Sequence, residues 1–236
     1  MSEEAEAGPS PFALLFAPDR GMGRQARVGR TGRLFLFAWL CALLLGAALA
    51  YRVDARSATL CKLEMSGQLQ TMSDRQVADE THGAERVAEV LSIAKGVVGV
   101  PIQLGTTCLA LVALVWFLRG RIKGSAVVPV AAATLLPGAI AALLDAVIAF
   151  RHAAIPPDGV PLTPRSLAAI MPLLGHPLDG PWMKLAGALD FFSLWAALML
   201  AFGVAAVGQL PRKSALTGTL IAWVCYQLLT QVATKG

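Results

Sequence analysis

The chain has few charged residues and few cysteines for its length. Only 15% of its 236 residues are Asp, Glu, Lys or Arg, whereas soluble domains contain about 25%. This composition excludes an ordinary soluble domain. The four cysteines, Cys41, Cys61, Cys108 and Cys225, include no Cys-x-x-Cys pair, so no disulfide framework is indicated. Only Cys61 lies in a polar region, where it is a candidate for an exposed thiol.

Signatures of catalysis, cofactor binding and metal binding are also missing. The chain has no Gly-x-Ser-x-Gly, P-loop or His-Glu-x-x-His motif. Its three histidines, His82, His152 and His176, lack the spacing of metal ligands. We therefore expect neither an enzyme nor a cofactor or metal site. The net charge of +5 does not indicate nucleic-acid binding, because the basic residues lie beside apolar segments, where membrane orientation explains them.

What the chain has in abundance is long apolar segments. A hydrocarbon core of about 30 Å needs roughly 17 to 25 apolar residues in a helix. Inside lipid every backbone N–H and C=O must be hydrogen-bonded within its own segment, so helices are expected. The predicted spans are Leu34–Tyr51, Val97–Leu118, Ala126–Phe150, Leu185–Val207 and Leu216–Val232. The predicted fold is therefore all-α, a polytopic membrane helix bundle with five transmembrane helices.

The basic residues predict how this bundle is oriented. Residues 1–33 form a tail with five arginines before the first span, and the short connections Arg119–Lys123 and Arg212–Lys213 are also basic. Because Lys and Arg concentrate on the cytoplasmic side, we expect the N-terminus and both turns there, with the C-terminus outside. Residues 34–234 form the transmembrane domain.

The tail also contains a short apolar segment, Phe12–Ala17, followed by Pro18. It is too short to cross a bilayer. Two alternatives remain for it: an amphipathic turn in the membrane interface, assisted by the arginines that follow, or a segment that packs on its own bundle.

The longer connections are expected outside the cytoplasm. The polar insertion at about residues 52–90 has few turn residues, which predicts helical extensions of the first two spans. Ser73-Asp74-Arg75-Gln76 has the pattern of a capping box that begins the second of these helices. In the connection Arg151–Trp182, prolines prevent a continuous helix, and Arg165–Leu174 is predicted as a short helix between them.

Three ionisable residues in or beside the spans are the chemically interesting positions: Lys95, Asp145 and Asp190. Because consecutive spans alternate in direction, all three are predicted at similar depth beneath the outer interface. Ionisable groups in a bilayer usually face protein or water and have partners. A proton- or ion-handling site is one interpretation. A structural polar cluster is the other, and it is favoured because the inner halves of the spans offer no continuing polar path.

Most of the chain, and above all its C-terminal half, resembles a known family. Segments that carry the resemblance are Leu189–Trp195, with the pattern Asp-x-Phe-x-Leu-Trp, Ala201–Ala205, Pro211–Lys213, Ile221–Trp223, Leu135–Pro137 and Leu15–Pro18. They resemble bacterial Yip1-domain membrane proteins, although Arg52–Ala94 is longer and more polar than that family's pattern. The resemblance implies five helices and a cytoplasmic N-terminus. Eukaryotic relatives act in vesicle traffic with small GTPases, a role we do not carry over because the Ala-, Gly- and Arg-rich composition indicates a bacterial protein.

From these observations we expect a non-enzymatic integral membrane protein that binds protein partners or organises membrane lipid. The expected location is the bacterial cytoplasmic (inner) membrane, and the expected partners are the lipid bilayer and other membrane proteins or further copies of the chain. Neither nucleic acid nor a small-molecule ligand is indicated. The alternative is a transporter or channel subunit that uses an outer-leaflet cluster of Asp145 and Asp190.

Overall fold

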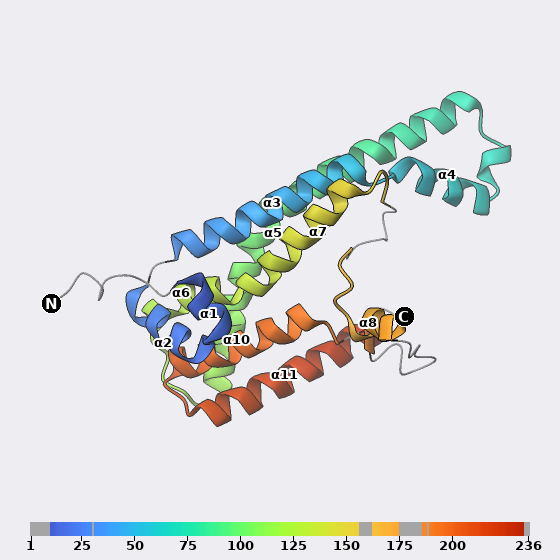
Figure 1. Ribbon diagram of the computed structural model, residues 1–236. Coiled ribbons are helices and arrows are strands. Elements are labelled where there is room, and N and C mark those ends of the chain that lie inside the picture. Colours follow the sequence, from blue (N-terminus) through green and yellow to red (C-terminus); the bar gives the residue numbers. More distant parts are fainter. Residues whose placement is uncertain (1–9, 30, 156–161, 175–185, 188, 234–236) are drawn as a thin grey trace. The chain divides into compact units, whose positions relative to one another are not determined.

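The computed structural model describes residues 10–29, 31–155, 162–174, 186–187 and 189–233 (Figure 1). The regular secondary structure of these residues is helical. Several positions named above lie outside the described residues. They are the prolines at 156, 157 and 161, His176, Leu185 at the predicted start of the fourth span, and the C-terminal Gly236. The chain divides into two compact units. Unit 1 comprises residues 1–38, 101–139 and 164–236, and unit 2 comprises residues 39–100 and 140–163.

Four helical segments are long and apolar enough to cross a membrane, which confirms the membrane character of the chain. They are α3 (Gly32–Arg52), α5 (Asp74–Phe117), the pair α6 (Gly124–Thr134) and α7 (Leu136–Arg151), and α10 (Phe191–Gly208). The predicted fifth span lies in α11 (Arg212–Ala233), which is helical but is not one of these four. Polar residues at intervals along α11, such as Thr217, Thr219 and Gln227, make it less apolar than the others.

Two predicted spans differ from their expected limits. The third is interrupted at Leu135, between α6 and α7, because Pro137 has no N–H to donate to the carbonyl of Ala133 one turn earlier. The fourth was expected to contain Asp190, but α10 begins one residue after it. Asp190 is the N-cap residue, and its carboxylate accepts a hydrogen bond from the Ser193 N–H at 3.0 Å. Such a cap satisfies a backbone donor at the helix start and so defines where the helix begins.

In unit 1 the N-terminal tail packs on the helical bundle. Helix α1 (Pro11–Phe16) and α2 (Pro18–Val28) precede α3, and α2 lies against α6 and α10. Leu14 and Met22 are fully buried in the same apolar core as Val130 and Val204. Buried Gln25 donates from Nε2 to the Pro129 carbonyl at 3.3 Å. Of the two alternatives for the tail, the structure supports packing on its own bundle.

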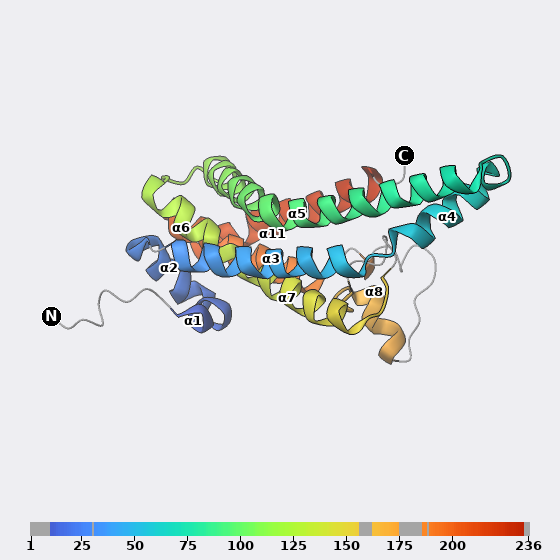
Figure 2. The same cartoon turned by 90° about the horizontal axis from the view of Figure 1, so that it is seen from above.

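In unit 2 the backbones of α3 and α5 approach closely at two glycines. A Cβ on Gly46 would lie 2.7 Å from the Ser92 carbonyl oxygen, and one on Gly96 would lie 2.9 Å from the Ala42 oxygen. Small residues at a helix contact allow such a close approach. Figure 2 shows α3 and α5 running side by side. The other face of α3 contributes Ala48 to a second apolar cluster, with Ala146 and Ala149 of α7.

The polar insertion is helical, as predicted, but with an interruption. The capping box is confirmed: the Ser73 N–H donates to Gln76 Oε1 at 2.9 Å, and α5 continues from this cap into the second span. The first span is not extended, because α3 ends at Arg52 and α4 (Ala55–Met65) is a separate helix. Asp54 caps α4 by accepting the Ser57 N–H at 2.9 Å, and this hydrogen bond lowers the pKa of the Asp54 carboxyl.

The short turn η2 (Gln68–Gln70) completes the insertion between α4 and α5. In unit 1, α8 (Leu167–Ile170) and η3 (Met171–Leu174) occupy the region predicted as a short helix at Arg165–Leu174. The helix there is thus confirmed as two short pieces, with Ser166 as its cap.

Candidate functional site

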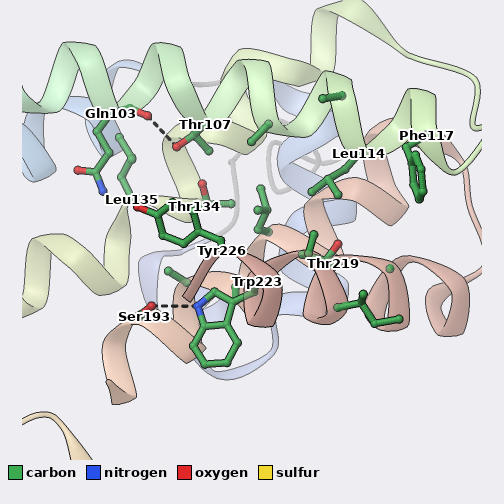
Figure 3. A pocket seen from close by; sticks show the side chains of 18 of the residues that line it. Gln103, Thr107, Leu114, Phe117, Thr134, Leu135, Ser193, Thr219, Trp223 and Tyr226 are labelled. Atoms are coloured by element: carbon green, nitrogen blue, oxygen red, sulfur yellow. Dashed lines mark hydrogen bonds between the residues drawn. The ribbon is translucent and has the colours of Figure 1, made fainter. Parts of the chain in front are cut away.

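A cavity inside unit 1 has the character of a binding site. It has a volume of about 770 Å³ and lies between α5, α6, α10 and α11. Figure 3 shows Thr107 and Leu114 of α5 on one side and Thr219 and Trp223 of α11 on the other. Its lining extends along α5 from Gln103 to Phe117, which at 1.5 Å per residue is roughly 21 Å. Small-molecule sites in proteins are of this size, roughly 300 to 1,000 Å³.

The walls of the cavity are mainly apolar. Its floor is buried, since Leu135 and Ala197 are each 4% exposed. Its rim carries large exposed side chains, including Trp116 (77% exposed), Phe117 (76%) and Tyr226 (63%). None of the described residues that line it is an Asp, Glu, Lys, Arg or His. The cavity therefore suits an uncharged group, because an unpaired charge in an apolar site is strongly unfavourable.

Most hydroxyl groups in the cavity already have partners. Thr107 donates to the Gln103 carbonyl at 2.7 Å and Thr134 to the Ala131 carbonyl at 2.7 Å. Ser193 Oγ accepts from the indole N–H of Trp223 at 3.0 Å (Figure 3) and from Gln227 Nε2 at 3.2 Å. The hydroxyls of Thr107 and Thr134 thus donate to carbonyls of their own helices, and Ser193 links α10 to α11.

Thr219 is the buried exception, whereas the other hydroxyl in the lining without a partner among the described residues, that of Tyr226, belongs to an exposed side chain. It is 1% exposed, and its Oγ1 has no hydrogen-bond partner among the described residues. A buried hydroxyl without a partner destabilises a protein by roughly 1 to 3 kcal/mol. Thr219, Trp223 and Tyr226 recur at spacings of four and three, which places them on one face of α11. That spacing is the signal in the sequence that indicates this face, which the predicted cluster of Lys95, Asp145 and Asp190 does not include.

Of the residues predicted as a polar cluster, Asp145 is buried in unit 2. It is 2% exposed, and its Oδ1 accepts from the Thr163 N–H at 2.8 Å and from the Thr163 hydroxyl at 2.6 Å. The Asp145 carboxylate therefore ties Thr163, in the connection that follows α7, to α7 itself.

Asp190 belongs to unit 1 and has a different set of partners. Besides capping α10, its Oδ2 pairs with Arg165 Nε at 2.9 Å. The backbones on either side are joined as well: the Phe191 N–H donates to the Arg165 carbonyl, and the Leu167 N–H donates to the Leu189 carbonyl. Asp190 thus fastens the segment before α8 to the start of α10.

Lys95 lies in unit 2, where it is exposed and lines a separate cavity of about 450 Å³ with Gly46, Ser92 and Ala142. Lys95 and Asp145 are both described, and no ion pair joins them. Asp145 and Asp190 belong to different units, so a shared cluster stays a prediction. Neither aspartate lines either of the two cavities.

No match to a protein-family model, to a curated protein or to a solved structure is found for this chain. The site has to be interpreted from its own residues. No group of three His, Cys, Asp or Glu side chains among the described residues is arranged to hold a metal ion.

A second feature of unit 1 is an accumulation of positive charge at one end of the bundle. Its eight basic side chains are all exposed and come from α2, the α5–α6 turn and the start of α11: Arg20, Arg24, Arg27, Arg119, Arg121, Lys123, Arg212 and Lys213. We call these residues the basic end. Figures 1 and 2 both show the three segments at the same end of unit 1.

Specific contacts hold the basic end together. The backbone N–H groups of Arg121 and Lys123 donate to the carbonyls of Gly208 and Val207, each at 3.0 Å, which fixes the α5–α6 turn on the end of α10. Arg212 at the start of α11 pairs with Asp19 of α2 at 3.3 Å. Asp19 is the only acidic residue in the three segments.

Proposed function

We propose that this chain is a non-enzymatic integral membrane protein that organises lipid by holding anionic headgroups at the basic end. In this proposal all five predicted helices cross a bacterial cytoplasmic membrane, and the N-terminus and the basic end face the cytoplasm. We also propose membership of the Yip1 family, on the resemblance of Leu189–Trp195 and the other segments named above.

The observation that carries the proposal is the gathering of basic residues from three separate segments. Positive charges beside a span orient it even when they are scattered. Here folding brings α2, more than 90 residues away in sequence from either turn, onto α6 and α10. The face of α2 with Met22, Gln25 and Ala26 is buried, which leaves Arg20, Arg24 and Arg27 exposed.

A membrane surface is the partner that best fits this geometry. The turns Arg119–Lys123 and Arg212–Lys213 connect apolar helices, so their side chains lie where headgroups are expected once those helices are in lipid. A group of four to eight basic residues at the cytoplasmic end of a span attracts anionic lipid, with about 1 kcal/mol for each Lys or Arg close to the surface.

The alternative function, as a transporter or channel subunit, would depend on Asp145 and Asp190. Their described contacts favour a structural role. Asp145 is hydrogen-bonded to Thr163, and Asp190 is both a helix cap and the partner of Arg165. A proton or ion path needs polar groups that continue across the membrane, and neither carboxylate lines the cavity of its own unit.

The test measures lipid selectivity in reconstituted vesicles. Spin-labelled phosphatidylglycerol and phosphatidylcholine are added separately, and electron paramagnetic resonance gives the association of each with the protein. We expect phosphatidylglycerol to be preferred by roughly threefold or more at low salt. The preference should decrease when salt is raised to about 0.5 M, because screening weakens exposed charge interactions.

The variant that removes Arg20, Arg24 and Arg27 by substitution with Gln should lose most of this preference, while Met22 and Gln25 keep α2 in place. A matched control replaces Lys62, Arg75 and Arg86, which are equally exposed but lie in the polar insertion, with Gln. The control should keep the preference. An unchanged preference in the α2 variant, or an equal loss in the control, would contradict the proposal.

A further inference from the structure

We propose that the cavity between α5, α6, α10 and α11 binds one uncharged lipid whose hydroxyl or carbonyl oxygen hydrogen-bonds to Thr219. This site is independent of the basic end, which interacts with charged headgroups at the surface. The ligand class follows from three properties of the cavity: its lining, its buried unsatisfied hydroxyl, and its rim.

The lining excludes a charged ligand. No carboxylate, amine, guanidinium or imidazole group is present among the described residues that surround the cavity. A phosphate or carboxylate headgroup inside it would have no counter-charge, and burial without one is strongly unfavourable. The apolar walls suit a hydrocarbon or isoprenoid chain instead.

The unsatisfied hydroxyl distinguishes a lipid with a polar oxygen from a plain hydrocarbon chain. Thr107 and Thr134 donate to carbonyls of their own helices, and Ser193 is bonded to Trp223 and Gln227. Thr219 Oγ1 has no hydrogen-bond partner among the described residues, even though the residue is almost completely buried, with 1% of its surface exposed. A hydroxyl group both donates and accepts, so a ligand hydroxyl or carbonyl oxygen completes its bonding.

The position of Thr219 sets the orientation of the ligand. Thr219 is seven residues after Arg212, or roughly 10 Å along α11 from the basic end. Tyr226 is a further seven residues along the same helix and also lines the cavity (Figure 3). The oxygen of the ligand thus lies just below the headgroup layer, and its chain extends toward Tyr226, Ser193 and Gln103.

The rim indicates entry from the bilayer rather than from water. Trp116, Phe117 and Ile221 border the cavity, and these apolar side chains are between 59% and 77% exposed. In a membrane such side chains face lipid. A chain that enters between these side chains meets the apolar floor at Leu135 and Ala197.

The experiment uses three photoreactive probes of equal chain length that each carry a diazirine and an alkyne: a long-chain alcohol, the corresponding fatty acid and the corresponding alkane. The full chain in vesicles is labelled over a range of probe concentrations, and the modified residues are located by mass spectrometry. We expect the alcohol to label α5 and α11 residues of the cavity saturably, at concentrations several-fold lower than the acid or the alkane.

Thr219→Val removes the hydroxyl with little change of shape, and should weaken labelling by the alcohol roughly three- to tenfold while labelling by the alkane stays constant. Thr107→Val is the matched control, because its hydroxyl is bonded to Gln103 and should not contribute. Ala222→Phe, which fills part of the cavity, should reduce labelling by all three probes.

Equal, non-saturable labelling by the three probes would show general lipid contact and overturn the proposal. So would unchanged alcohol labelling in Thr219→Val, or crosslinks from this face to another protein with none to the alcohol. Thermal unfolding of each variant separates loss of the site from loss of the fold, since Thr219→Val should unfold at the same temperature as the natural sequence or higher.

Discussion

The contacts of the buried Asp145 carboxylate are those of a structural residue. It accepts two hydrogen bonds from Thr163, at 2.8 Å and 2.6 Å. Asp145→Asn keeps an acceptor at this position, so we expect destabilisation below about 1 kcal/mol. Asp145→Leu leaves the Thr163 N–H and hydroxyl without this acceptor and should destabilise by roughly 2 kcal/mol or more. Unfolding in mixed detergent micelles measures both.

The same pair of variants tests the alternative function. If Asp145 carried protons, both substitutions would abolish pH-dependent uptake into vesicles while the fold survived. Equal destabilisation by Asn and Leu would instead show that the hydrogen bonds to Thr163 contribute little. Asp190 should respond differently, since Asp190→Asn can still accept from Ser193 but loses the ion pair with Arg165.

The close approach of α3 and α5 depends on Gly96. A Cβ there would lie 2.9 Å from the Ala42 carbonyl oxygen and 3.3 Å from the Leu43 Cα, both backbone atoms that cannot rotate away. We expect Gly96→Ala to force the helices apart and destabilise unit 2 by roughly 1 to 3 kcal/mol. Thermal unfolding in detergent, followed by circular dichroism, measures the effect.

Gly99 provides the control for that substitution, because it lies on the same helix three residues later and a Cβ there meets nothing within 4 Å. Gly99→Ala should leave the unfolding temperature unchanged or raise it, since alanine favours the helix. If the two substitutions had the same effect, helix propensity rather than packing would explain the result.

The orientation of the chain in the membrane can be tested with a native cysteine, Cys61. Cys61 is exposed on α4, in the insertion predicted outside the cytoplasm, whereas Cys41 is buried. We expect a membrane-impermeant maleimide to label Cys61 in intact cells, and Cys61→Ser to abolish that labelling. In a variant without native cysteines, Ser214→Cys at the basic end should react only after the cells are permeabilised.

An epitope tag after Gly236 extends this test to the fifth span. If α11 crosses the bilayer, the tag is reached by antibody on spheroplasts, whose cytoplasmic membrane is intact and exposed. A tag that is reached only after permeabilisation would mean that four helices cross, which would contradict the five-helix proposal. Labelling of Ser214→Cys from outside intact cells would reverse the predicted orientation.

The amino-acid sequence alone determined the membrane location, the helical class and several helix starts. These are local properties: the length of an apolar run decides whether it can cross a bilayer, and Ser73 and Gln76 form their capping box within one turn of helix. The break at Leu135 has a local cause too, the missing N–H of Pro137, but the prediction of an uninterrupted third span was wrong there. The start of α10 was misplaced, because Asp190 was interpreted as a residue within the span and not as its cap.

Only the tertiary structure decided which faces of the helices meet. Membrane helices are apolar on all sides, so their hydrophobic pattern does not indicate which side packs on protein. The cavity, the unsatisfied Thr219 hydroxyl and the partners of Asp145 and Asp190 all depend on contacts between distant segments. The basic end was visible in the sequence as three separate groups of charges. Its assembly required α2 to pack on α6 and α10, a contact that no local pattern specifies.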